Sequence, residues 1–109
     1  MDPERLRLVL EAFIEALAWW TNEGPVRIEG AVRNGRLVLE ARRRGTMLSQ
    51  EDAERLFLAR APGTGSGSKI GLFVANGVAS AQGGTTSVRV GDELMFGLDV
   101  PAEPANRSV

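Results

Sequence analysis

The sequence has no cysteine and no histidine, and these two absences exclude several kinds of function at once. Without cysteine there can be no disulfide bond, no thiolate zinc site and no cysteine nucleophile. Without histidine there can be no Ser-His-Asp triad, no imidazole metal site and no histidine of this chain that accepts a phosphoryl group. Any chemistry must therefore depend on carboxylates, hydroxyls, arginines, backbone amides and Lys69, which is the sole lysine.

Charge of one sign and long hydrophobic runs are also lacking. The 13 basic and 14 acidic residues give a net charge of −1, which argues against a dedicated nucleic-acid-binding protein. No apolar run reaches the roughly 18–20 residues of a membrane span, and the beginning of the chain (residues 1–4) lacks the basic region of a signal peptide. We therefore expect no nucleic-acid partner, no membrane contact and a cytoplasmic location.

What is present is the pattern of one folded domain, with 43% hydrophobic residues among 109. Apolar residues at helical spacing from Leu6 to Trp20 predict a helix capped by Asp2, and Asn34-Gly35 predicts a tight turn between two strands. The remaining predicted elements are a short helix from about 49, a Gly/Ser-rich loop over 62–68, a helix over about 69–82, and strands over about 85–90 and 94–100. This order predicts an α+β, two-layer sandwich with three helices on one face of a mixed sheet of four or five strands. We expect residues 1–101 to form the domain and residues 102–109 to be a disordered tail.

The stretch after the Gly/Ser-rich loop carries a family resemblance. Gly67-Ser68-Lys69-Ile70-Gly71-Leu72-Phe73-Val74-Ala75, with the closing Gly83-Gly84, resembles the second glycine box of the ATP-binding domain of bacterial sensor histidine kinases. This is the HATPase domain, which has the Bergerat (GHKL) fold. The segments 9–21, 48–57 and 96–101 are similar to the N-box helix, the F-box region and the closing strand of that family. The resemblance implies the Bergerat fold, ATP as a ligand and a place in two-component signalling.

The same alignment puts unusual residues where that family binds magnesium and nucleotide. The two N-box asparagines, one of which holds the metal ion, fall on Ala12 and Ala16, whose methyl groups cannot ligate Mg²⁺. The aspartate that accepts the adenine amino hydrogen falls on Arg43, which can only donate. The phosphate-binding lysine falls on Trp19, and a glycine of the first box falls on Met47. We therefore expect no metal site, no catalytic residue in this chain and no resident cofactor; weak binding of ATP or another nucleotide stays open.

The residues that the resemblance still proposes as nucleotide contacts are Trp20, Arg43, Gly45, Gly65, Gly67, Lys69 and Gly71. The run 42–44 either binds an anion through its guanidinium groups or bonds to protein groups and solvent. The loop over 63–67 either cradles phosphate, helped by Lys69, or is a flexible connection. Trp19 and Trp20 are about 100° apart on a helix, so one is expected inside and the other in the former pocket or on a partner surface.

Bulky groups predict that the former nucleotide pocket is partly filled. Trp19, Met47 and Leu94 stand where the family has a lysine, a glycine and a threonine. Because protein interiors pack densely, we expect Met47 and one tryptophan to be more than half buried. Arg43 is expected to point at a carboxylate, a carbonyl or solvent, because an unpaired buried guanidinium is costly. The loop over 63–68 is expected to be the most mobile internal segment.

The sequence thus predicts a histidine-kinase-like ATPase domain with a degenerate ATP and magnesium site. Its expected role is that of a pseudokinase or regulatory binding module in bacterial two-component-type signalling. The expected partner is a signalling protein, either a kinase dimerisation domain or a response regulator. Two alternatives stay open: a divergent ATP-binding catalytic domain that phosphorylates a histidine on another domain or chain, and a structural module that forms a homodimer.

Overall fold

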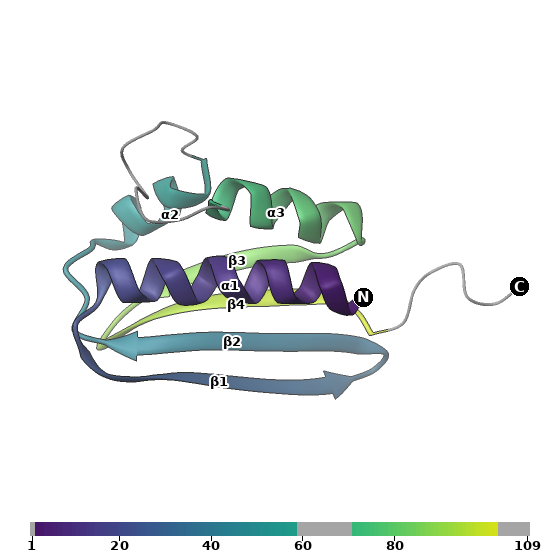
Figure 1. Cartoon of the computed structure of the whole chain (residues 1–109), viewed down its shortest axis with the longest axis horizontal. Coiled ribbons are helices and arrows are strands. Elements are labelled where there is room, and N and C mark those ends of the chain that lie inside the picture. Colours follow the sequence, from purple (N-terminus) through teal and green to yellow (C-terminus); the bar gives the residue numbers. More distant parts are fainter. Residues whose placement is uncertain (1, 59–70, 103–109) are drawn as a thin grey trace, which may run out of the picture.

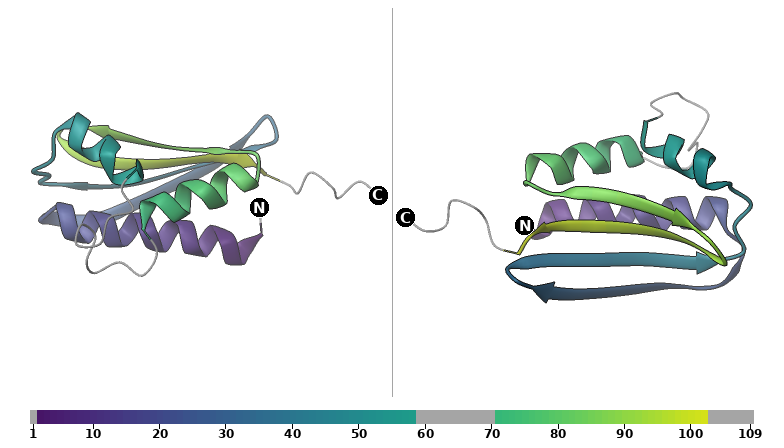
Figure 2. Two further views of the ribbon diagram at one scale, coloured as in Figure 1. Left: turned by 90° about the horizontal axis from the view of Figure 1, so that it is seen from above. Right: turned by 180° about the vertical axis from the view of Figure 1, so that it is seen from behind.

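The computed structural model describes residues 2–58 and 71–102, and their secondary structure follows the predicted order. The helices are α1 (Pro3–Trp20), α2 (Gln50–Leu58) and α3 (Leu72–Ala81). The strands are β1 (Glu23–Arg33), β2 (Arg36–Arg44), β3 (Thr85–Val90) and β4 (Glu93–Pro101). The three helices cover one face of the sheet (Figures 1 and 2), and the opposite face is bare of helices. The predicted α+β two-layer sandwich is confirmed.

The four strands are ordered β1-β2-β4-β3, and each neighbouring pair of these described strands is antiparallel. The sequence-based expectation of a mixed sheet is therefore corrected. Strands β2 and β3 run in the same direction, as expected for two strands that helices connect, but β4 lies between them and pairs with both. The insertion of β4 removes the parallel pair.

Local signals in the sequence fix the ends of several elements. The Asp2 side chain accepts a hydrogen bond from the Glu4 amide at 2.9 Å, and the Ser49 hydroxyl accepts one from the Asp52 amide at 3.0 Å. At the β1–β2 turn, Asn34 and Gly35 have φ values of 53° and 75°, the left-handed pair that a two-residue hairpin requires. These caps and this turn are confirmed predictions.

The core lies between the helices and the inward face of the two central strands. Phe96 of β4 is fully buried, and its ring stacks on Phe13 of α1 at 5.4 Å between centroids. The ring of Phe57 of α2 meets the Phe96 ring edge-on, with 5.8 Å between centroids. Two helices are therefore anchored on one residue at the middle of the sheet.

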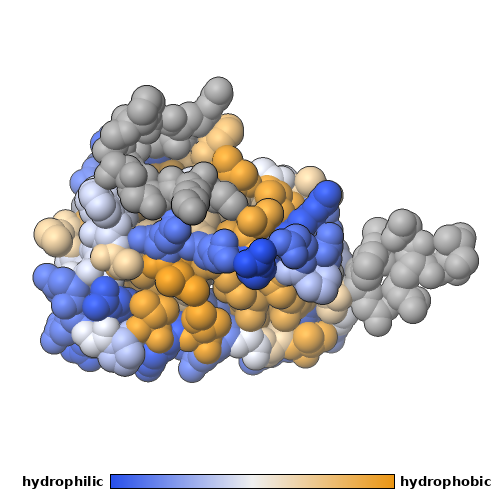
Figure 3. Space-filling model, viewed as in Figure 1, coloured by the Kyte–Doolittle hydropathy of each residue, from blue (hydrophilic) through white to orange (hydrophobic). Residues whose placement is uncertain are grey.

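Burial is distributed unevenly between the two edge strands. Every residue of β1 except the half-buried Val26 is exposed, whereas alternate residues of β3 are half-buried beneath α2 and α3. Figure 3 shows apolar side chains gathered along the lower side of the molecule, beneath the charged ridge of α1. The large apolar residues exposed on α1 and β1 are Ile14, Trp19, Ile28 and Val32.

Candidate functional site

The candidate nucleotide site lies at the end of the sheet where α1 ends, β1 begins and β2 ends (Figure 1). Thr21 caps α1 at this end: its backbone amide donates to the Leu17 carbonyl at 3.0 Å, and its hydroxyl donates to the same oxygen. Thr21 is only 4% exposed, and it is the buried polar residue of the described part of the chain. The C-terminal end of α1 is therefore a hydrogen-bonded corner.

Arg43 extends from β2 into this corner. Its Nε donates to the Gly24 carbonyl at 2.7 Å, and its Nη1 donates to the Thr21 carbonyl at 3.1 Å and to the Thr21 hydroxyl at 3.4 Å. The alternation of β2 explains the direction, since Ala41, two residues earlier, is fully buried under the helices. The expectation that Arg43 points at a carbonyl is confirmed, and its guanidinium group ties β2 to the link between α1 and β1.

Gly45, directly after β2, needs to be a glycine for two reasons. Its φ is +87°, which side-chain-bearing residues rarely adopt, and a Cβ placed on it would overlap the Asn22 side-chain oxygen and lie 2.9 Å from Glu23 Cβ. The loop after β2 thus packs directly against the beginning of β1. Gly45 and Arg43 together close the same corner from two sides.

Met47 does not fill a pocket at this corner, because it is 72% exposed. The expectation that it is more than half buried is wrong. The neighbouring Leu48 packs against the core instead, and the Leu48 amide donates to the Thr46 hydroxyl at 3.1 Å. This local turn directs Leu48 inward and leaves Met47 at the surface.

The two tryptophans at the end of α1 divide as expected. Trp20 is half-buried and packs against the core, whereas Trp19 is 51% exposed. Their rings meet edge-on with centroids 6.5 Å apart. Leu94, at the position of the family's threonine, is fully buried in the core. The expected burial of one tryptophan is confirmed.

The remaining candidates belong to the glycine-rich segment and the beginning of α3. Gly71 is exposed and occupies the N-cap position of α3, with extended backbone angles and its carbonyl accepting the Ala75 amide at 3.1 Å. Gly65, Gly67 and Lys69 lie outside the described residues, as does the loop over 63–68. The structure therefore brings Trp20, Arg43 and Gly45 to one end of the sheet. It places Gly71 at the beginning of a separate helix, α3.

The residues at the positions that the resemblance assigns to the metal site do not fit a magnesium ion. Ala12 is 2% exposed and belongs to the hydrophobic core, and Ala16 packs against that core. Within residues 2–58 and 71–102 there is no group of three or more Asp, Glu, His or Cys side chains that could hold a metal. Mg²⁺ requires hard oxygen ligands, which these positions do not supply.

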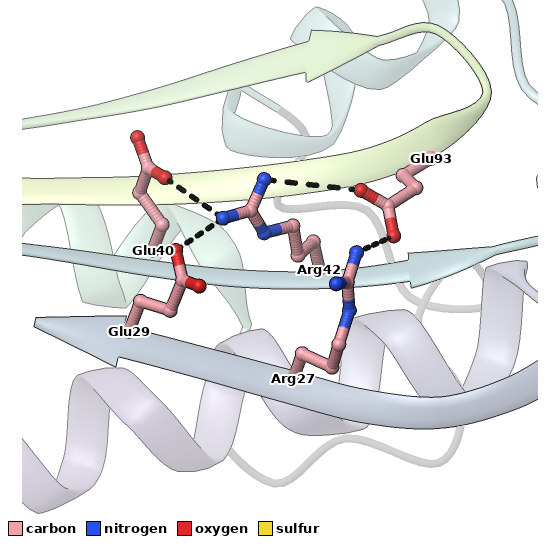
Figure 4. A network of polar contacts seen from close by, with 5 residues as sticks. All are labelled: Arg27, Glu29, Glu40, Arg42 and Glu93. Atoms are coloured by element: carbon pink, nitrogen blue, oxygen red, sulfur yellow. Dashed lines mark hydrogen bonds and ion pairs between the residues drawn. The ribbon is translucent and has the colours of Figure 1, made fainter.

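Sequence reasoning missed a second cluster of charge, on the sheet face opposite the helices (Figure 4). Arg42 points away from the helices and bonds Glu29, with Glu40 at 3.8 Å and Glu93 at 3.9 Å. Arg27 bonds the same Glu93. The Arg42 Nε is buried and has no hydrogen-bond partner among the described residues. The partners come from three strands, so spacing along the sequence gives no signal for this network.

Comparison with known proteins relates this fold to histidine kinases. Neither the protein-family models nor the curated proteins gave a match to the sequence. Solved structures do match: the histidine kinase AdeS of Acinetobacter baumannii has a TM-score of 0.74 at 25% identity over 94% of this chain. Full-length ShkA in complex with AMPPNP has a TM-score of 0.76 at 24% identity over 96% of the chain. The nucleotide-free catalytic domain of the histidine kinase ThkA has a TM-score of 0.76 at 20% identity over 98%.

The fold is that of the ATPase domain of histidine kinases, so the resemblance seen in the sequence is confirmed and the chain is a HATPase-like domain. The chain spans 48% of the AdeS chain, 23% of the ShkA chain and 71% of the ThkA chain. Among the described residues, no helix is both long enough and apolar enough to cross a membrane.

Proposed function

We propose that this domain is a regulatory binding module of bacterial two-component-type signalling, in which the histidine-kinase fold is kept and tight binding of magnesium and ATP is lost. The observation that carries the proposal is the position of Arg43. The resemblance puts the adenine-binding aspartate of the family at this residue, and its guanidinium group is bonded to the Thr21 and Gly24 carbonyls. A donor-only group already engaged with protein carbonyls cannot accept a hydrogen bond from adenine.

The energetic argument compares what is lost with what binding requires. A micromolar dissociation constant corresponds to about 8 kcal/mol. Each unmade hydrogen bond that leaves a buried group unsatisfied costs about 1–3 kcal/mol. The adenine acceptor is lost at Arg43, and the two asparagines, one of which holds the metal ion, are lost at Ala12 and Ala16, so several such terms are removed together. Phosphoryl transfer also loses the ion that neutralises the developing charge.

The test is a calorimetric titration of the domain with ATP and with AMPPNP, each with and without Mg²⁺. We expect dissociation constants weaker than about 100 µM in every case. Millimolar ligand should then stabilise the fold by at most about 1–2 kcal/mol. A Mg²⁺-dependent constant in the low micromolar range would contradict the proposal.

A pair of neighbouring arginines supplies the matched control. Arg43 faces the helices and the corner, whereas Arg44 is exposed at the end of β2. If Arg43 closes the corner, Arg43→Ala and Arg44→Ala should bind nucleotide with the same weak affinity. Arg43→Ala should nevertheless lower the melting temperature more than Arg44→Ala does. If Arg43 holds a phosphate, Arg43→Ala alone weakens binding.

The second outcome would favour the alternative function, a divergent ATP-binding domain that phosphorylates a histidine on another domain or chain. One comparison speaks for it, since the similar ShkA structure is a complex with AMPPNP. Because this chain has no histidine, labelled phosphate from ATP would appear on a separate kinase dimerisation domain and never as phosphohistidine here. Under the main proposal, such a dimerisation domain or a response regulator binds the domain without receiving phosphate.

A further inference from the structure

Strand β1 is a long edge strand that contributes little to the core of its own domain. It has 11 residues, and among them only Val26 is even half-buried. Ile28 and Val32 stand on its helix-side face with 44% and 63% of their surface exposed. β1 also carries Pro25 and four charged residues, but no strand in the described part of the chain pairs with its outer edge. An uncovered edge of this length is a template for pairing with another strand.

The hairpin fixes which backbone groups of β1 are free to pair. Arg33 and Arg36 flank the two-residue turn, so their backbone groups point toward each other. The register is unbroken from Arg33 back to Arg27, and inward and outward groups alternate along an antiparallel strand. The amides and carbonyls of Ile28 and Gly30 therefore point away from β2, and no strand in the described part of the chain pairs with them.

We propose that a second copy of this chain occupies this edge, with the two β1 strands antiparallel about a two-fold axis at Ile28. A strand paired with its own copy must be centred on a residue whose backbone groups point outward, which restricts the axis to alternate residues. An axis at Ile28 pairs the outward backbone groups of the two Ile28 residues and aligns Gly30 with the copy's Val26, which lies in the irregular stretch between Glu23 and Arg27. The two sheets then continue as one sheet of eight strands, twice the four of one copy.

Charge complementarity selects Ile28 over the two neighbouring centres, Val26 and Gly30. With the axis at Ile28, Arg27 of each copy lies opposite Glu29 of the other. An axis at Gly30 would place Arg27 opposite the copy's Arg33, and one at Val26 would place Glu29 opposite the copy's Glu23. Like charges directly opposite each other destabilise strand pairing, so both of these registers are disfavoured.

The existing ion pairs extend across the proposed axis. Within one copy Arg27 bonds Glu93 and Glu29 bonds Arg42 (Figure 4). Placing Arg27 beside the copy's Glu29 joins the two networks into one that alternates in sign. On the opposite face the Ile28 side chains of the two copies meet, which covers apolar surface that is exposed in the single domain.

The first test is the mass of the domain in solution, followed by sedimentation equilibrium from about 1 µM to about 500 µM. The mass should rise with concentration from 11.7 kDa to twice that value. Ile28→Lys should weaken association by at least about tenfold, since two ammonium groups would face each other at the axis. The matched control is Val74→Lys on α3, another exposed apolar residue at 49%, which should leave association unchanged.

The second test identifies the register and does not depend on a single variant. Arg27→Glu alone and Glu29→Arg alone each place like charges opposite each other in a homodimer, so both should associate weakly. Mixing the two variants restores opposite charges at both pairs, and a mixed dimer should form. Circular dichroism of each variant confirms that it is folded before mixing.

Three outcomes would overturn the proposal. One is a monomer over the whole concentration range. Another is a dimer that Ile28→Lys leaves intact. The third is the absence of a mixed dimer when the two folded charge variants are combined. If the domain stays monomeric and a different kind of partner covers β1, that result counts as the first outcome.

Discussion

The two edges of the sheet differ in how they are closed. At the β3 edge, the Gln50 side chain of α2 donates to the Val88 carbonyl at 3.0 Å and accepts from the Val90 amide at 2.7 Å. One carboxamide thus bonds the strand as a neighbouring strand would. At the β1 edge no described strand or helix does the same, and the strand is longer, with 11 residues against 6.

This difference indicates that one side of the sheet stabilises the fold and the other side is available for interaction. Two helices, Gln50 and part of the core cover the β3 side, so this side stabilises the fold. The β1 side contributes the Arg42 network on one face and exposed apolar residues on the other. Natural proteins protect their edge strands, and a long edge that exposes Ile28 and Val32 indicates a surface that is covered by something else.

The largest expected effect compares apolar truncations on the two sides. Phe57 is 8% exposed and its ring meets Phe96, so Phe57→Ala should reduce the free energy of unfolding by about 3–5 kcal/mol. Ile28→Ala, at 44% exposure, should cost less than about 1 kcal/mol at concentrations where the domain is monomeric. Chemical denaturation measures both values, and equal losses would remove the distinction between the two edges.

A smaller effect is expected from the charged network beside β1. Arg42→Met leaves Glu29, Glu40 and Glu93 without their shared cation and should cost about 1–2 kcal/mol. The loss should shrink at high salt, because screening weakens the repulsion among the carboxylates. Arg55→Met is the control: Arg55 pairs with Glu51 and Asp52 on the exposed surface of α2, where such pairs contribute at most a few tenths of a kcal/mol. Denaturation at low and high salt compares the two, and equal losses would make the network an ordinary surface pair.

The smallest effect concerns the closure of the β3 edge. Gln50→Ala removes two hydrogen bonds to β3 and one to Glu54, all at an exposed position, and should cost about 0.5–1.5 kcal/mol. The Val90 amide should also exchange faster with solvent, since its acceptor is gone. Gln50→Glu keeps an acceptor for Val90, loses the donor to Val88 and Glu54, and places a second carboxylate beside Glu54. Unchanged exchange of Val90 in Gln50→Ala would show that the carboxamide does not close this edge.

Much of the fold follows from short-range signals. Asp2, Ser49 and Asn34-Gly35 act within a few residues of themselves, and each begins or turns an element where the sequence predicts it. The position of β4 between β2 and β3 was not predicted, because strand order depends on pairing across the whole chain. Periodicity alone predicts the strands without their neighbours.

The candidate site was predicted in part. The resemblance located Arg43 and Gly45, and the structure places both at the corner where α1 meets β1. It did not reveal that Thr21 and Gly24 hold Arg43, because their carbonyls have no signature in the sequence. Met47 was predicted inside and is exposed, since the turn after Gly45 directs Leu48 inward in its place.

The most direct test of this account is amide hydrogen exchange along β1 at two protein concentrations. The amides of Glu29 and Ala31 point toward β2 and should be protected at both concentrations. The amides of Ile28 and Gly30 point outward and should exchange freely in dilute protein but become protected in concentrated protein. If Ile28 and Gly30 are already protected in dilute protein, or exchange freely at both concentrations, β1 is not an open edge that a second copy closes.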